Sequence, residues 1–249
     1  MLAPPQPATP KDRLIFALDV DDLDTAEKLV RQLAPKVGVF KVGPVLFTHV
    51  GPLIIDLIQG LGGKVFLDLK FHDIPATVAG AAREASKHRV KMFTVHALGG
   101  RKMIEHAAGE LLRATVVPGV ARPMPLAVTI LTSHEQADLA ALGLAPGTIA
   151  EHGTRLAKMA LEAGAEGVVA SAHELSTLVP ALPKGTIFVI PGIRGPGDAK
   201  GDQSRTMSAK EAIQAGATYV VVGRPIRDAK DPAGAAERIV EEIAAGLPS

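Results

Sequence analysis

A repeated pattern of a short β-branched, apolar segment followed by a longer segment with helical periodicity most constrains the fold of this 249-residue chain. The pattern recurs about every ~25–35 residues. The eight predicted strands are residues 13–20, 37–43, 64–70, 90–97, 125–131, 167–172, 186–192 and 218–225. Strands that alternate with helices pair in parallel, because each helix returns the chain to the same end of the sheet. The pattern therefore predicts an α/β protein with a (β/α)8 TIM barrel.

The clearest helical segments are residues 25–34, 148–164 and 234–246, where apolar residues recur at spacings of three and four. The last two segments end in Gly164 and Gly246, and glycine is typical of the residue that follows a helix. An open doubly wound sheet is the competing fold. Its G-x-G-x-x-G signature is missing after the first strand, and the nearest run, at residues 192–201, contains proline and opens no predicted helix.

We expect one catalytic domain over residues 13–246, preceded by a flexible tail over residues 1–12 that is rich in proline. No linker-like segment interrupts the barrel pattern. The chain is 47% hydrophobic and 21% charged, which excludes a disordered chain.

The sequence also limits the partners of the chain. The 27 basic and 26 acidic residues leave no basic excess that would favour nucleic acid. No apolar run approaches the ~20 residues that a membrane span needs, and the first residues lack the order of a secretion signal. With no cysteine, the chain has no disulfide or thiolate chemistry. We therefore expect a cytoplasmic protein that binds neither nucleic acid nor a membrane.

Ionisable residues stand at the ends of the first three predicted strands. The alternation of the third strand places Asp68 and Lys70 on one face, directed into the barrel mouth. Asp19 and Lys41 end the first and second strands. Charges in a cavity of low dielectric constant are costly unless they neutralise one another. The four residues therefore predict an alternating network at a functional site, although ion pairs that only cap the barrel are the alternative.

A second group of residues fits a phosphate site. The long loop after the seventh strand contains Arg194 and Gln203, and the eighth strand ends at Gly223 and Arg224. Phosphate sites recur at this place in such barrels. Arginine binds phosphate oxygens with two hydrogen bonds, and glycine allows a close approach of the backbone. An ordinary surface connection would explain the same residues.

The run FLDLKFHDIPATV at residues 66–78 resembles the signature of the orotidine 5′-phosphate decarboxylase family, in which an Asp-x-Lys-x-x-Asp array forms the reacting centre. One departure is Ala76, where the family commonly has asparagine, and it removes no charged group. Further matches extend along nearly the whole chain. They are LDV (18–20), FKVG (40–43), TVHALGG (94–100), LTS (131–133), IPGIR (190–194), DQSR (202–205) and VVGRPI (221–226).

The resemblance implies conversion of orotidylate to uridylate and CO2 in de novo pyrimidine biosynthesis, without a metal or a cofactor. Lys70 would stabilise the carbanion at C6 and then protonate it. Asp68 and Asp73 would keep the lysine charged and crowd the carboxylate of the substrate. Lys41 would support this catalytic array, and Asp19 would contact the ribose hydroxyls.

The resemblance also implies the remaining contacts of the substrate. Thr132 and Pro191 would border the pyrimidine, while the phosphate would lie against Arg194, Gln203, Gly223 and Arg224. In the family, the residues that match Asp73 and Thr77 enter the active site of the other subunit. A homodimer with a shared active site is therefore expected.

Two other functions are compatible with the residues. One is a magnesium-dependent sugar-phosphate decarboxylase or aldolase of the same barrel group, and the other is a barrel that binds a nucleotide without catalysis. His96 fits an ordinary histidine at the barrel mouth and is left out of the catalytic set. The other histidines show no metal-binding spacing.

Overall fold

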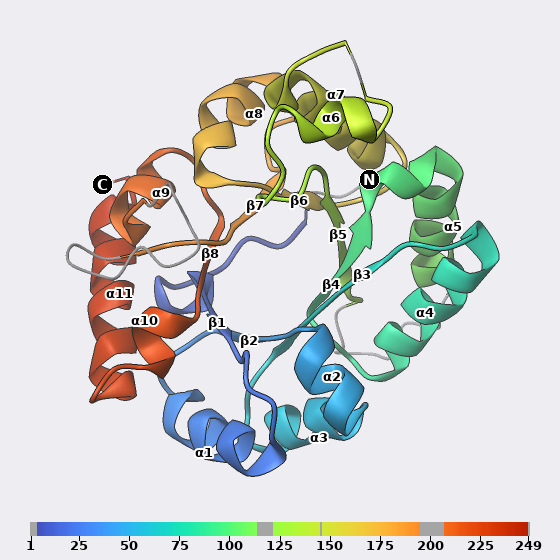
Figure 1. Ribbon diagram of the computed structural model, residues 1–249. Coiled ribbons are helices and arrows are strands. Elements are labelled where there is room, and N and C mark those ends of the chain that lie inside the picture. The colour runs from blue at the N-terminus through green and yellow to red at the C-terminus, as the bar shows by residue number, and fades with distance from the viewer. Residues whose placement is uncertain (1–3, 114–121, 145, 195–206, 249) are drawn as a thin grey trace.

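The computed structural model describes residues 4–113, 122–144, 146–194 and 207–248, and its eight parallel strands close into a barrel (Figure 1). Each strand pairs with the next one in the sequence, and the eighth pairs with the first. The strands are β1 (Leu14–Ala17), β2 (Val39–Val42), β3 (Val65–Phe71), β4 (Met92–His96), β5 (Met124–Val128), β6 (Gly167–Val169), β7 (Ile187–Ile190) and β8 (Tyr219–Val222). The predicted (β/α)8 barrel is confirmed, and the competing prediction of an open doubly wound sheet is wrong.

Helices form a ring outside the strands, as Figure 1 shows in a view along the barrel axis. The α-helices are α1 (Leu23–Leu33), α2 (Pro44–Val50), α3 (Leu53–Gly60), α4 (Pro75–Lys87), α5 (Gly100–Arg113), α6 (Asp138–Ala141), α7 (Ile149–Glu162), α8 (Leu175–Ala181), α9 (Ala209–Gln214), α10 (Arg224–Arg227) and α11 (Pro232–Gly246). The described residues also contain three short 3-10 turns: η1 (Lys11–Arg13), η2 (Ala97–Gly99) and η3 (Ala172–Glu174). Within the described ranges, no helix is both long enough and apolar enough to span a membrane.

The three helices predicted from periodicity are present, with ends that shift by a few residues. Helix α7 begins after Thr148, whose side chain and that of Glu151 form a reciprocal capping box. Gly164, just beyond α7, has a φ of +104°, which suits the residue after a helix. Gly246 ends α11 as predicted, but it is the last residue of the helix rather than the residue that follows it, and it is buried. A Cβ there would be 2.7 Å from the carbonyl oxygen of Lys210, so close packing against α9 explains this glycine.

Two apolar layers make the core. Residues of alternating strand positions fill the barrel interior, and they include Phe66, Met92, Leu126 and Tyr219. The intervening positions, with the apolar faces of the helices, form a larger layer outside the sheet. The barrel is thus a packed body rather than a pore, and a cavity forms only where the interior layers end.

Gly167 provides a test of how tightly the barrel closes. A Cβ at this first residue of β6 would lie 2.3 Å from the carbonyl oxygen of Ile187 on β7. We expect Gly167→Ala to lower the free energy of unfolding by about 1–3 kcal/mol, as overpacking does in cores. Denaturant unfolding measures this change. Gly60→Ala is the control, because a Cβ there would meet no atom within 4 Å apart from its own helix backbone and the adjacent residues, and the change should stay within about 0.5 kcal/mol. Equal effects of the two substitutions would contradict this packing.

Candidate active site

Four charged side chains of alternating sign lie in a row across the ends of the first three strands. The Nζ atom of Lys41 is 2.8 Å from Oδ1 of Asp19 and 3.9 Å from Oδ2 of Asp68. The Nζ atom of Lys70 is 3.0 Å from both carboxylate oxygens of Asp68. The structure therefore brings together the four residues that the sequence predicts at the barrel mouth, and we call them the charged row.

Burial differs along the charged row. The side chains of Asp68 and Lys41 are only 13% and 14% exposed, whereas those of Lys70 and Asp19 are 36% and 54% exposed. A buried carboxylate between two ammonium groups has its desolvation cost offset by both neighbours. Asp68 and Lys41 thus form the buried middle of the charged row, whereas Lys70 and Asp19 at its two ends are accessible to a bound molecule.

The backbone at Lys70 is unusual. Its φ of +51° lies in the left-handed region, where a residue with a Cβ is uncommon. The register between β3 and β4 also shifts between Leu67 and Phe71, which marks an irregularity of the β-bulge kind. Bulges redirect a side chain at the end of a strand. Simple alternation predicted the correct face for Lys70 but not this bulge.

A cavity of about 390 Å³ opens above the charged row. Its floor is apolar and includes Ala17, Phe66, Val128 and Val221 from the strands. An apolar floor lowers the local dielectric constant and strengthens the interactions of the charges above it. A hollow of about 450 Å³ also lies beside α1, but Arg31 is the one ionisable residue among those that line it. The cavity at the strand ends is therefore the candidate active site.

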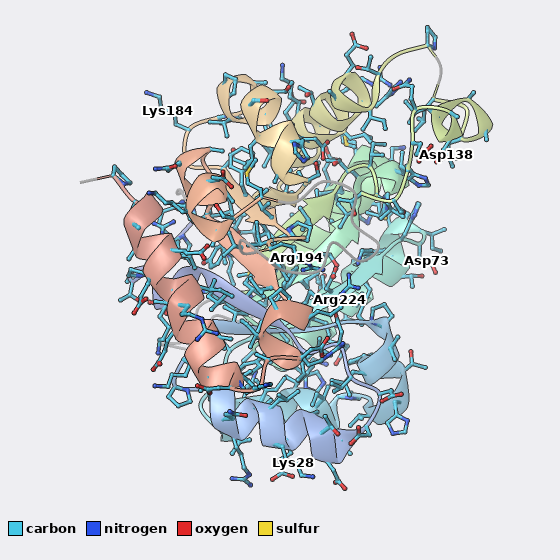
Figure 2. All side chains as sticks on the ribbon, turned by 60° about the vertical axis from the view of Figure 1, so that its left-hand side comes forward. Lys28, Asp73, Asp138, Lys184, Arg194 and Arg224 are labelled. Atoms are coloured by element: carbon cyan, nitrogen blue, oxygen red, sulfur yellow. The ribbon has the colours of Figure 1, made fainter. Side chains whose placement is uncertain are left out.

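The rest of the cavity wall comes from residues at and beyond the ends of β5, β6, β7 and β8. Thr132 follows β5 and lines the cavity, and Pro191 follows β7. Arg194, Gly223 and Arg224 line it as well. Figure 2 shows the two labelled arginines close together in the view, one beyond β7 and the other at the start of α10. The structure thus places a positive cluster beside the charged row.

Arg227 is a cavity residue that the sequence analysis missed. It lines the cavity, and its guanidinium donates a hydrogen bond of 2.8 Å to the backbone carbonyl oxygen of Asp19. The same guanidinium pairs with Asp228. Its spacing of three residues from Arg224, within the run RPIR, places both on one side of the short helix α10. That spacing is the signal that could have identified it.

Two of the predicted site residues that the structure describes, Asp73 and Thr77, are not among the residues that line this cavity. Asp73 and Thr77 are exposed, and Oδ1 of Asp73 accepts the backbone N–H of Ile74 at 2.6 Å. In Figure 2 Asp73 lies toward the right-hand edge of the molecule, away from the two arginines. Gln203 falls in residues 195–206, outside the described residues.

His96 ends β4 and is not among the residues that line the cavity. Its ring stacks on that of His72 with 5.4 Å between the centroids, and its Nδ1 accepts the backbone N–H of Leu98. Burial first, and then the nearby His72 and Lys70, lower the pKa of His96. A neutral imidazole with these neighbours fits a structural role. Among the described residues, no three or more His, Asp or Glu side chains are arranged to hold a metal ion.

Comparisons with known proteins agree with this geometry. Residues 12–239 match the model of the orotidine 5′-phosphate decarboxylase / HUMPS family. A protein from Syntrophotalea carbinolica named orotidine 5′-phosphate decarboxylase is 50% identical over 238 residues, which are 95% of this chain and 97% of that protein. A protein of the same name from Syntrophus aciditrophicus is 47% identical over 238 residues, which are 95% of this chain and 94% of that protein.

A solved structure shows the same arrangement of the chain. The crystal structure of orotidine 5′-phosphate decarboxylase from Lactobacillus acidophilus matches with a TM-score of 0.82 and 38% sequence identity. The match covers 92% of this chain and 98% of that one. The similarity thus extends over nearly the whole barrel. From the family match and these relatives it follows that the chain belongs to the orotidine 5′-phosphate decarboxylase / HUMPS family.

Proposed function

We propose that this protein decarboxylates orotidine 5′-phosphate to uridine 5′-phosphate and CO2, in the cytoplasm and as part of de novo pyrimidine biosynthesis. The observation that carries the proposal is the ammonium group of Lys70, held 3.0 Å from both oxygens of Asp68 at the edge of the cavity. The names of the relatives supply the substrate. The positive cluster beside the cavity supplies a place for its phosphate.

The charged row fits the electronic demand of this reaction. When the bond between C6 and the carboxylate breaks, CO2 leaves and the electron pair stays on C6, in an orbital that the ring π system cannot delocalise. A fixed positive charge beside C6 stabilises this carbanion. Lys70 then transfers a proton from Nζ to C6 and recovers one from solvent. The net reaction consumes the substrate and one proton from solvent and yields uridine 5′-phosphate and CO2, so atoms and charges balance.

Asp68 has two roles in the proposed mechanism. Before substrate binds, Asp68 pairs with Lys70, and together with Asp19 it neutralises Lys41, so that both ammonium groups have an acidic partner. It also stands near the position of the departing carboxylate, where repulsion between like charges favours loss of CO2. Lys41 and Asp19, joined at 2.8 Å, present an ammonium and a carboxylate to the ribose hydroxyls.

The part of the cavity wall that follows β5, β7 and β8 would bind the phosphate and the base. Arg194 and Arg224 provide charge-assisted donors, and the backbone N–H of Gly223 adds a third. Gln203 is proposed as a further donor. Thr132 and Pro191 would border the pyrimidine. Binding the phosphate far from C6 lets its interaction energy hold the reacting carbon against Lys70.

We also propose a homodimer in which each subunit completes the active site of the other. Asp73 and Thr77 are exposed outside the cavity of their own chain, so on that chain they do not reach the charged row. Large apolar side chains near the same end of the barrel are also exposed, by 66% at Ile74, 66% at Val45 and 38% at Leu98. Burial of such side chains against a second copy would stabilise the dimer.

The magnesium-dependent decarboxylase or aldolase and the non-catalytic barrel make different predictions. The first would lose activity in the presence of a chelator. The second would bind the nucleotide without releasing CO2. Following the absorbance of orotidylate with a chelator present separates both from the proposed function, which requires undiminished conversion.

Substitution of Lys70 tests the proton donor. We expect Lys70→Ala to lower kcat at least about 100-fold, the scale of a positioned acid or base, with an unchanged circular dichroism spectrum. Lys36→Ala is the control, because Lys36 pairs with Glu237 outside the cavity and its loss should leave kcat unchanged. A decrease of less than tenfold in the Lys70 variant would remove that residue from its role.

Substitution of Arg224 tests the phosphate site. We expect Arg224→Ala to weaken the use of orotidine 5′-phosphate by about 1.5–3 kcal/mol in kcat/KM, the range for hydrogen bonds to charged groups. The slow reaction of orotidine, which lacks the phosphate, should not change. Steady-state kinetics with both substrates measure the difference. The assignment is wrong if both substrates lose equally.

Mixed dimers test the shared active site. Lys70→Ala and Asp73→Ala should each have low activity alone. A dimer with one subunit of each kind contains one doubly altered site and one intact site, so activity should reappear after the subunits are coexpressed. Two affinity tags allow the mixed dimer to be isolated. Isolated mixed dimers without activity would show that Asp73 does not act across the interface.

A further inference from the structure

One buried hydroxyl joins the two central residues of the candidate active site. Thr94 lies on β4, and its side chain is fully buried. Its Oγ1 atom accepts the backbone N–H of Lys70 at 2.8 Å. The same hydroxyl donates to Oδ1 of Asp68 at 3.0 Å. Thr94 is not among the residues that line the cavity, so it acts from behind the charged row.

The hydroxyl of Thr94 forms hydrogen bonds with two groups near the bulge, the backbone N–H of Lys70 and the carboxylate of Asp68. Lys70 has left-handed backbone geometry where the ladder between β3 and β4 shifts register, and its N–H takes a side-chain acceptor there. Asp68, in turn, needs donors for its buried oxygens. A threonine hydroxyl supplies one donor and an acceptor at once, which neither a hydrocarbon nor a carboxylate side chain provides.

We infer that Thr94 is a positioning residue for the proposed decarboxylation, holding the bulge that aims Lys70 and fixing the carboxylate of Asp68 against it. The inference rests on the proposed function for its reaction and on the two hydrogen bonds for its geometry. Both bonds converge on a single oxygen, so one side chain sets the relative position of the proton donor and its counter-charge. Small displacements of reacting groups reduce rates strongly.

Two other buried threonines show that this arrangement is specific. Thr218 also accepts a backbone N–H, that of Phe188 at 3.0 Å, but it precedes β8 at the opposite end of the barrel. The hydroxyl of Thr129 has no hydrogen-bond partner among the described residues. Of these three buried threonines, Thr94 alone bonds to a member of the charged row.

Thr94→Val removes the hydroxyl and keeps the shape, whereas Thr94→Ser keeps the hydroxyl. We expect the valine variant to lower kcat by about 10- to 100-fold, the effect of a displacement near 1 Å, and the serine variant to restore most of it. The KM for orotidine 5′-phosphate should change by less than about threefold, because the phosphate site is untouched. Thr218→Val is the matched control, because it loses an equivalent bond to the backbone, and its kcat should stay at the wild-type value.

Amide hydrogen exchange tests the same contact without relying on activity. The Lys70 N–H should exchange at least about tenfold faster in Thr94→Val than in the wild type, since it loses its acceptor, and should stay protected in Thr218→Val. Unchanged exchange at Lys70 would overturn the inference, and so would a wild-type kcat in the valine variant or no rescue by serine. If the wild-type protein does not convert orotidylate, the proposed function fails separately, while the exchange measurement still decides whether Thr94 holds the bulge.

Discussion

Mutual neutralisation of buried charge at the barrel mouth is the interaction on which the candidate active site depends. Asp68 is 13% exposed and lies between the ammonium groups of Lys41 and Lys70, at 3.9 and 3.0 Å. Removing both lysines would leave the buried carboxylate of Asp68 unpaired, which costs several kcal/mol in protein interiors. Replacing all three residues with apolar side chains would avoid that cost. The arrangement is thus poorly explained by stability and well explained by chemistry.

The barrel makes this arrangement possible. Neighbouring parallel strands end together, so residues at their ends become neighbours although the sequence separates them by about twenty residues or more. One step below the charges, Ala17 and Phe66 begin the apolar interior. The interior excludes water from one side of the row, while the cavity leaves the other side open. A bound molecule that fills the cavity would leave the charges in a medium of low dielectric constant, where their effect on a reacting carbon is largest.

The sequence predicted much of this because the relevant signals are local. Strand alternation alone placed Asp68 and Lys70 on the inner face, and eight repeats of strand and helix specified the barrel. The bulge at Lys70 had no local signal, since its acceptor, Thr94, lies 24 positions away on another strand. Gly246 does end α11, but the reason for a glycine there is its close packing against α9, which has no local signal in the sequence. Arg227 did carry a signal, the spacing from Arg224 on α10, which the motif matches obscured.

The Asp-x-Lys-x-x-Asp spacing itself places its two aspartates differently, with Asp68 in the charged row and Asp73 outside the cavity. Asp68 and Lys70 are two positions apart on β3, so they share a face and make contact. Pro75 opens α4 only five residues after Lys70, and proline there fixes the start of the helix. The intervening residues must leave the barrel axis to reach the outer ring, and Asp73 leaves with them and bonds the N–H of Ile74. A third carboxylate at this spacing is therefore directed away from the cavity of its own chain, which is why we propose that it completes the cavity of a second subunit.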